Sequence, residues 1–175
     1  MRQGLIHIYC GDGKGKTTAA IGLAVRAAGC GKRVFIVQFL KGQATGELKS
    51  LACIPEIKLL RGKACSKFTC QMDERELQQT YDLNTKNLLT AVETARSGEC
   101  DVLILDEILG TLSCDLIDSD LLRSLIEQKP EPLELVLTGR NPPQWLLDQA
   151  DYVTEMVKRK HPYDQGIPAR EGIEM

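Results

Sequence analysis

The stretch Leu5-Ile-His-Ile-Tyr9, followed by Gly11-Asp-Gly-Lys-Gly-Lys-Thr-Thr18, decides the fold of this chain. The apolar run predicts a short buried strand, and the glycines after it stop that strand. Glycine lets the backbone bend where side chains would clash, so several N–H groups can point inward at one anion. Residues 17–30 predict a helix, whose N-terminus adds the positive end of its dipole. The stretch therefore predicts a loop that binds phosphate groups.

The lysines and the threonine of this loop extend the prediction to a nucleotide with magnesium. The pattern G-x-x-x-x-G-K-[ST] ends correctly at Gly15, Lys16 and Thr17, although its first glycine falls on Cys10. Lys16 is predicted to reach the phosphate oxygens as a point charge, and the hydroxyl of Thr17 to bind Mg²⁺. Lys14 supplies a second charge. The predicted ligand is ATP with Mg²⁺, and a glycine-rich turn without a ligand is disfavoured.

The whole chain is predicted to be one domain, residues 1–175, of ordinary globular composition. Apolar residues make up 43% and charged residues 26% of the 175 residues, enough for a sizeable core. The net charge of -2 argues against nonspecific binding of nucleic acid, which usually needs a basic surplus. The seven cysteines are an odd number without a preceding secretory signal, so a reducing cytoplasm is expected. No apolar run reaches the roughly 18 residues of a membrane span.

Strands alternate with helices along the rest of the chain. Short apolar runs predict strands at 34–39, 57–60, 102–105, 133–137 and 152–157. Helices are predicted at 45–53, from Asp73 to Gly98, at 119–128 and from Pro142 to Leu147. Asp73 and Glu76 have the spacing of a capping box. Residues 61–72 are predicted as a loop, and the tail from Lys160 shows no regular pattern.

This alternation predicts βαβ units, which build a parallel sheet with helices on both faces. The predicted class is α/β, a P-loop NTPase-like (RecA-like) three-layer sandwich with a mostly parallel central sheet. In such sheets ligands bind at the carboxyl ends of the strands. The loop 11–18 and the pair Asp106-Glu107, which follows the strand at 102–105, are both expected at that edge.

Four charged side chains are candidates for the site. Asp106 and Glu107 end an apolar strand, where carboxylates are costly unless they are paired or bind a metal. Magnesium is the preferred partner, directly or through water, and the alternative is a helix cap or a surface pair. Arg26, on an otherwise apolar helix, either forms a buried ion pair or reaches the nucleotide. Arg140 either faces an anionic substrate or stabilises its own loop.

Four segments of the chain combine into a family pattern: the loop 11–18, Val37-Gln-Phe-Leu-Lys-Gly42, Leu105-Asp-Glu107 and the tail Lys160-His-Pro-Tyr-Asp-Gln-Gly-Ile-Pro-Ala-Arg170. Together with Thr138-Gly-Arg140 they resemble the P-loop type of ATP:corrinoid adenosyltransferases. The resemblance implies transfer of the 5′-deoxyadenosyl group of ATP to the Co(I) of a reduced corrinoid (cobalamin), with release of inorganic triphosphate. It also implies a homodimer and an electron-donating reductase as partner.

The resemblance assigns roles to individual residues. The expected triphosphate-binding residues are Gly11, Asp12, Gly13, Lys14, Gly15, Lys16, Thr17 and Thr18. Lys14, Lys16 and Thr17 are the expected catalytic residues, because the two lysines offset the charge that grows on the leaving triphosphate. Thr17 and Glu107 are expected to hold Mg²⁺. Arg26 and Arg140 are expected to contact the nucleotide, and Phe68 the corrinoid.

The chain departs from the family pattern at Cys70, where relatives usually carry Trp in Phe-Thr-Trp. The loss of this aromatic side chain affects the expected contact with the corrinoid. The chain also begins almost directly at its first strand, without the N-terminal segment of some relatives. The alternatives that remain are a P-loop ATPase, a nucleotide kinase, or a non-catalytic nucleotide- or corrinoid-binding module. His161 is assigned no proton-transfer role.

Overall fold

A computed structural model describes residues 3–42, 45–62, 67 and 69–174 of the chain. Six parallel strands form one sheet in the order β3-β2-β4-β5-β1-β6. They are β1 (Ile6–Cys10), β2 (Val34–Gln38), β3 (Ile57–Arg61), β4 (Val102–Asp106), β5 (Glu134–Thr138) and β6 (Tyr152–Glu155). All six predicted strands are present, and the prediction of a mostly parallel sheet is confirmed. Because all strands run the same way, every loop that follows a strand lies at one edge.

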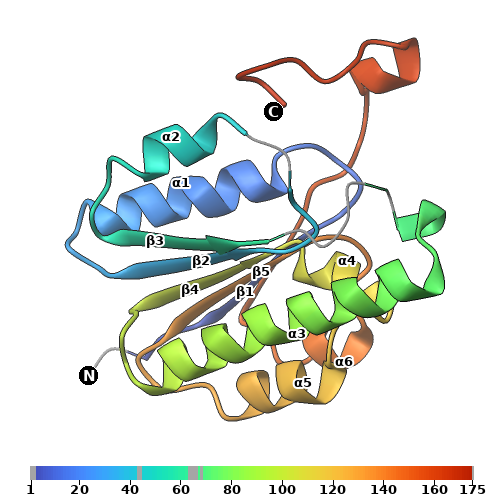
Figure 1. The fold of residues 1–175 in the computed structure, drawn as a ribbon. Coiled ribbons are helices and arrows are strands. Elements are labelled where there is room, and N and C mark those ends of the chain that lie inside the picture. Colours follow the sequence, from blue (N-terminus) through green and yellow to red (C-terminus); the bar gives the residue numbers. More distant parts are fainter. Residues whose placement is uncertain (1–2, 43–44, 63–66, 68, 175) are drawn as a thin grey trace.

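Helices cover both faces of the sheet, as Figure 1 shows. On one face lie α1 (Lys16–Ala28) and α2 (Glu47–Leu51). The other face is covered by α3 (Glu74–Arg96), α4 (Ile108–Ser113), α5 (Ser119–Glu127) and α6 (Gln144–Leu147). The side chains of the strands belong to two separate hydrophobic cores, because successive side chains along a strand point to opposite faces of the sheet. In β2, Val34 and Ile36 belong to the core under α1, whereas Phe35 and Val37 belong to the core under α3. This arrangement confirms the predicted three layers.

Helix α1 buries only one stripe against the sheet, formed mainly by Ala20, Ala24, Ala27 and Ala28. These small side chains let the helix approach the strands closely, which places its N-terminus at the edge of the sheet. Although its sequence is apolar nearly all round, α1 is not buried on several sides. Val25 is 45% exposed, because α1 belongs to an outer layer and only one side of it faces the sheet.

Helix α3 begins at the predicted capping box. The side chain of Asp73 accepts a hydrogen bond from the backbone N–H of Glu76 at 2.9 Å, and Glu76 accepts one from the N–H of Asp73 at 3.0 Å. Such a cap contributes about 1 kcal/mol to helix stability. The helix packs Leu88 and Val92 into the larger core.

Three short elements were not predicted from the sequence. They are α4 and two 3₁₀ turns, Thr69–Gln71 and Pro162–Gln165. The six residues of α4 include Gly110, whose low helix propensity argues against a helix in the sequence. Burial of Ile108 and Leu109 stabilises the helix in the structure. The turn at 162–165 has a readable signal, since proline follows His161, whose Nδ1 accepts from the N–H of Tyr163 at 3.2 Å.

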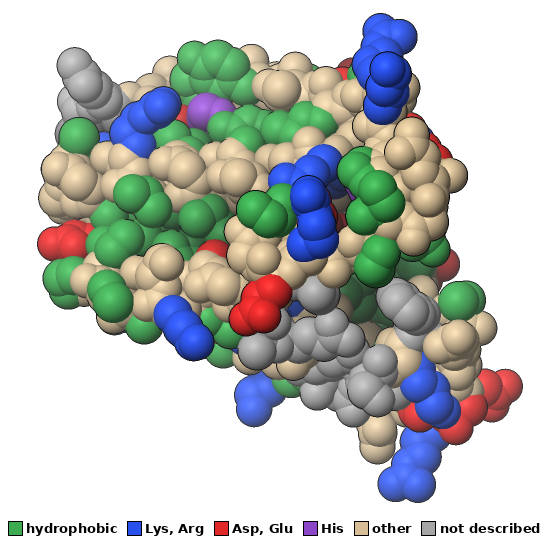
Figure 2. All heavy atoms as spheres, turned by 90° about the horizontal axis from the view of Figure 1, so that it is seen from above, with side chains coloured by type: hydrophobic (Ala, Val, Ile, Leu, Met, Phe, Trp, Pro, Cys, Tyr) green, Lys and Arg blue, Asp and Glu red, His purple; other side chains and the backbone are tan. Residues whose placement is uncertain are grey.

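The surface mixes charge with apolar groups. On the face drawn in Figure 2, the coloured Lys and Arg side chains lie among hydrophobic and polar groups and do not form a continuous stripe. Strand β6 is an exposed sheet edge, with Tyr152 at 51% and Val153 at 49% exposure. No helix in the part of the chain that the structure describes is long and apolar enough to span a membrane.

Candidate functional site

The loop between β1 and α1 lies at the carboxyl edge of the sheet, as predicted. Gly11 and Gly15 adopt φ angles of 103° and 114°, which side chains rarely tolerate. A Cβ on Gly11 or Gly13 would lie 2.5 or 2.6 Å from the carbonyl oxygen of Met156, just after β6. Cys10 is still part of β1, and its carbonyl accepts a hydrogen bond from the N–H of Met156 at 2.8 Å. The imperfect first position of the motif is therefore a strand residue, and the loop begins at Gly11.

Lys16 lies folded over this loop. Its ammonium donates hydrogen bonds to the carbonyls of Gly11 and Gly13, both at 2.8 Å, and the residue is only 8% exposed. Burial lowers the pKa of Lys16, and the nearby carboxylate of Glu107 opposes that shift. A buried ammonium with only carbonyl partners lacks a full counter-charge, so an anion in the loop would be strongly favoured.

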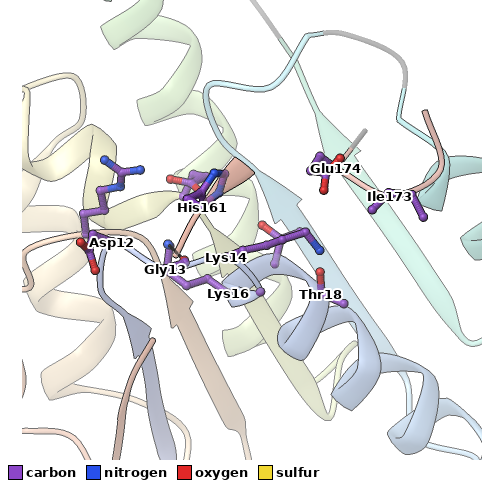
Figure 3. A pocket seen from close by; sticks show the side chains of 12 residues that line it. Asp12, Gly13, Lys14, Lys16, Thr18, His161, Ile173 and Glu174 are labelled. Atoms are coloured by element: carbon purple, nitrogen blue, oxygen red, sulfur yellow. Dashed lines mark hydrogen bonds between the residues drawn. The ribbon is translucent and has the colours of Figure 1, made fainter. Parts of the chain in front are cut away.

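A cavity of about 230 Å³ lies above the loop (Figure 3). The residues that line it come from the loop, from the ends of β4 and β5, and from the C-terminal tail. They are Asp12, Gly13, Lys14, Gly15, Lys16, Thr17, Thr18, Glu107, Arg140, His161, Ile173 and Glu174. The structure thus brings together nearly all the residues predicted to bind triphosphate and metal. Gly11 lies directly below, with its carbonyl bound to Lys16.

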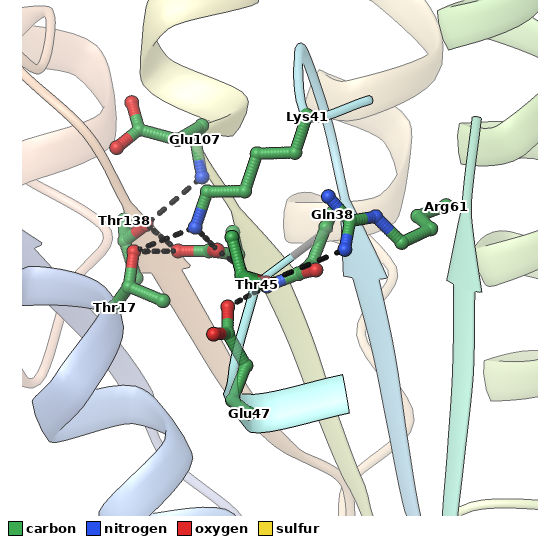
Figure 4. Close-up of polar contacts among 9 residues, drawn as sticks. Thr17, Gln38, Lys41, Thr45, Glu47, Arg61, Glu107 and Thr138 are labelled. Atoms are coloured by element: carbon green, nitrogen blue, oxygen red, sulfur yellow. Dashed lines mark hydrogen bonds and ion pairs between the residues drawn. The ribbon is translucent and has the colours of Figure 1, made fainter. Parts of the chain in front are cut away.

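Asp106, the last residue of β4, organises the polar cluster beside this cavity (Figure 4). Asp106 is only 1% exposed. Oδ1 accepts hydrogen bonds from the hydroxyls of Thr17 at 2.8 Å and Thr138 at 2.7 Å. Oδ2 accepts from the ammonium of Lys41 at 2.6 Å and from the amide of Gln38 at 3.2 Å. Four donors therefore compensate the burial of this carboxylate.

Glu107 turns the chain from β4 into α4. Its φ of 64° is uncommon for a residue with a side chain, and its N–H donates to Thr138 Oγ1 at 2.9 Å. Burial raises the pKa of Glu107, the charge of Asp106 raises it further, and Lys41, Lys16 and Arg140 oppose the rise. A strained backbone and a carboxylate that resists ionisation at the rim of a polar cavity are typical of functional sites.

The oxygen ligands at this place fit Mg²⁺. The hydroxyl of Thr17 and the carboxylate of Glu107 line the same cavity, with Asp106 hydrogen-bonded behind them. Among the described residues, no group of three or more His, Cys, Asp or Glu side chains could hold a metal by itself. Mg²⁺ usually takes one or two protein oxygens together with water and phosphate oxygens. The residues therefore suit a magnesium ion that arrives with a nucleotide.

Two arginines predicted for the site lie in different surroundings. Arg140 follows β5 and lines the cavity, where its charge lowers the pKa of Lys16. Arg26 lies in the last turn of α1, at the end of the helix away from the loop, and does not line the cavity. Its side chain is exposed, so the alternative of a buried ion pair is wrong. Phe68 lies outside the described residues, and Cys70 is exposed in the 3₁₀ turn at 69–71.

Sequence reasoning assigned no role to Lys41 or to Thr138 and none to the tail residues at the cavity. Lys41, Thr138 and His161 lie in segments of the family pattern, which was their only signal. Lys41 and Thr138 come near Asp106 because β2 and β5 both neighbour β4, a strand order that the sequence does not give. Ile173 and Glu174 had no signal. They reach the cavity because the chain continues past β6 with Lys158, whose N–H donates to Asp12 Oδ1 at 2.9 Å.

The sequence is similar to known proteins over nearly its whole length. The family model described as ATP:corrinoid adenosyltransferase BtuR/CobO/CobP matches residues 2–175. The chain belongs to this family. A corrinoid adenosyltransferase of a Sinorhizobium species is 37% identical over 98% of this chain and 80% of its own length. The corrinoid adenosyltransferase CobA of Salmonella typhimurium is 33% identical over 98% of this chain and 86% of its own length.

A third relative, the corrinoid adenosyltransferase of Pseudomonas aeruginosa, is 31% identical over 98% of this chain. The expected corrinoid adenosyltransferase activity is therefore confirmed at the level of the family, with ATP and a corrinoid as the substrates that the family name implies. The predictions of a P-loop ATPase, a nucleotide kinase and a non-catalytic module lose their support. A cavity lined by a phosphate-binding loop and a carboxylate suits ATP, one of the substrates that the family name implies.

Proposed function

We propose that the cavity above the loop 11–15 holds the triphosphate of ATP with Mg²⁺, while the 5′-deoxyadenosyl group passes to the Co(I) of a reduced corrinoid. One observation carries this proposal: Lys14, Lys16, Arg140 and the N-terminus of α1 all meet at one cavity, beside the carboxylate of Glu107. Such a convergence of positive groups suits a polyanion.

The reaction asks little covalent chemistry of the protein. The electron pair of Co(I) attacks the ribose 5′ carbon, a Co–C bond forms, and the C–O bond to the triphosphate breaks with its electrons on the leaving oxygen. No protein nucleophile or general base is needed. The work of the chain is to hold the reactants in line and to stabilise the charge that develops on the triphosphate.

The positively charged residues supply that stabilisation. Lys16 exchanges its two carbonyl partners for phosphate oxygens, and Lys14, which is exposed at the cavity, adds a second charge. The N–H groups from Gly13 to Thr18 form a concave donor surface that recognises anionic oxygens whatever their order, so ATP can lie reversed along the loop. Thr17 and Glu107 would hold Mg²⁺, which supplies further neutralisation of the leaving group when bound.

The remaining partners follow from the family and from the surface. Phe68 and the neighbourhood of Cys70 are proposed to meet the corrinoid, and Arg26 the nucleotide. A homodimer is proposed, and the exposed edge strand β6, with Tyr152 and Val153, supports it because uncovered sheet edges favour further pairing. A reductase in a reducing cytoplasm is proposed as the source of the electron for Co(I).

An anaerobic assay tests the proposal. The protein is mixed with ATP and a chemically reduced corrinoid, with Mg²⁺ or with a chelator, and the Co–C bond is followed by its absorption. We expect alkylated corrinoid only with Mg²⁺, and a loss of about 100-fold or more in Thr17→Val, because a metal and phosphate contact is removed. The control Thr90→Val, on the far side of the sheet in α3, should keep full activity. Equal turnover with the chelator would refute the magnesium role.

A further inference from the structure

Lys41 brings an ammonium group to the proposed metal position. It lies three residues beyond β2, and its side chain is 23% exposed. The ammonium is 2.6 Å from Asp106 Oδ2 and 3.0 Å from Thr17 Oγ1 (Figure 4). Thr17 is the residue whose hydroxyl is proposed to bind Mg²⁺. In the structure this hydroxyl already contacts a cation, and that cation belongs to the protein.

We propose that the ammonium of Lys41 is the internal counter-ion of the ligand-free enzyme, and that binding of magnesium with ATP exchanges this ammonium for the metal. The inference rests on the magnesium site proposed above. It makes Lys41 a positioning residue that decides when the metal binds, and it separates the role of Lys41 from those of Lys14 and Lys16 in the loop.

The hydrogen bonds explain why the two cations compete. The hydroxyl of Thr17 donates its hydrogen to Asp106 Oδ1, which leaves the lone pairs of Oγ1 for contact with a cation. The ammonium of Lys41 donates a hydrogen bond to this oxygen. A metal bound there would contact the same oxygen. Two positive charges in contact repel each other strongly in a partly buried site. Coexistence is therefore disfavoured, and one cation must displace the other.

Burial of Asp106 explains why a counter-ion is needed at all. Its side chain is 2% exposed, and a carboxylate left in such a place without a cation is strongly destabilising. Thr17, Thr138 and Gln38 donate hydrogen bonds to it but carry no charge. Lys41 provides the charge before ATP arrives. Its flexible four-carbon stem lets it leave again without moving the strand.

The backbone beside Lys41 is consistent with a strained, exchangeable contact. Leu40 has a φ of 56°, a left-handed conformation that branched apolar residues seldom adopt. Such conformations persist where surrounding contacts hold them, and they are common at sites that change state. The freed ammonium would lie next to Thr17, a residue that lines the cavity.

Binding of Mn²⁺ in the absence of nucleotide tests the exchange, because it needs no turnover. Mn²⁺ is titrated into the protein and its free fraction is read by electron paramagnetic resonance. We expect weak binding to the wild type, and binding at least about tenfold tighter to Lys41→Met and to Lys41→Gln, since one contacting like charge is removed. Lys41→Arg should bind as weakly as the wild type. Lys49→Met, which removes an exposed charge on α2, is the matched control and should change nothing.

A second pair of titrations locates the gained ion and separates this inference from the magnesium site itself. Thr17→Val in the Lys41→Met background should abolish the gain, and circular dichroism checks that each variant is folded. If the wild type binds Mn²⁺ with ATP but both neutral variants bind it no tighter without ATP, the exchange is wrong and the magnesium site stands. If the wild type fails to bind Mn²⁺ even with ATP, both proposals fall.

Discussion

The two sides of the phosphate cavity differ in how they are held. On the side of Asp106, five polar residues from three strand ends and a helix form a cluster around this buried carboxylate, with bonds of 2.6–3.2 Å. On the side of the tail, the contacts are exposed ion pairs, Lys158 with Asp164 at 3.0 Å and Arg170 with Glu174 at 2.9 Å. Thr17 from the first side and Glu174 from the second line the same cavity above the loop.

This difference separates two tasks. Buried, charge-assisted hydrogen bonds fix side chains in one arrangement, which suits the positioning of a metal and a leaving group. Ion pairs between exposed side chains contribute little to stability, so the tail can rearrange at low cost. The tail also leaves apolar side chains uncovered, because Tyr163 is 74% and Ile173 56% exposed.

The largest effect on activity is expected for Lys16, in the loop that lines the cavity. Lys16→Ala should lower kcat about 100- to 1,000-fold, since one preorganised charge at the leaving group is lost. The rate of Co–C bond formation measures it, and unfolding by urea verifies that the fold is kept. Lys32→Ala removes an exposed charge after α1 and should leave the rate unchanged. Near-normal turnover of Lys16→Ala would mean that the loop is not the triphosphate site.

Asp106→Ala tests the buried side directly. The substitution removes the acceptor of the Lys41 ammonium and of the hydroxyls of Thr17 and Thr138. The free energy of unfolding should therefore fall by about 3 kcal/mol. Asp106→Asn retains one acceptor oxygen and should lose less. Both are measured by urea denaturation. Equal stability of Asp106→Ala and the wild type would show that this side is no better held than the tail.

Gly13→Ala tests how closely the segment after β6 approaches the loop. The added Cβ would lie 2.6 Å from the carbonyl oxygen of Met156 and displace backbone, so a loss of about 1–3 kcal/mol in unfolding free energy is expected. Gly22→Ala is the matched control in α1, where no atom lies within 4 Å of the new Cβ. That control should gain about 0.5–1 kcal/mol from helix propensity. A neutral Gly13→Ala would contradict the close contact.

Glu107→Gln should stabilise the protein modestly while it weakens metal binding. Burial raises the pKa of Glu107 in the folded state, so its ionisation opposes folding above that pKa. The gain from glutamine should therefore be present at neutral pH and vanish as the pH falls below the usual glutamate range, where the carboxyl is protonated in both states. Thermal unfolding against pH tests this. A gain that persists in acid would point to packing instead of charge.

The smallest effect is expected in the tail. Arg170→Gln combined with Glu174→Gln should leave the midpoint of thermal unfolding unchanged, because the pair lies at the surface and Arg170 is 56% exposed. Activity with ATP and corrinoid is compared in parallel with a second exposed pair, Arg123→Gln with Glu127→Gln in α5. A clear loss of stability in the tail variant alone would remove the contrast between the two sides.

Much of the fold could be predicted from the sequence, because apolar strands and capped helices carry local signals. The strand at 102–105 and the capping box of Asp73 and Glu76 are such cases. The short helix α4 could not, since it depends on burial in the larger core and on the left-handed turn at Glu107. The loop and Glu107 were found by their motif. The place of Lys41 and of the tail depends on strand order, which periodicity does not encode.

In the proposed reaction, the loop after β1 holds a triphosphate that departs as one unit. A single anaerobic turnover with the reduced corrinoid in excess over enzyme-bound ATP measures it most directly, with triphosphate and phosphate separated by anion exchange and the Co–C bond quantified by absorption. We expect one inorganic triphosphate for each Co–C bond formed. Release of ADP and phosphate without alkylated corrinoid would contradict it.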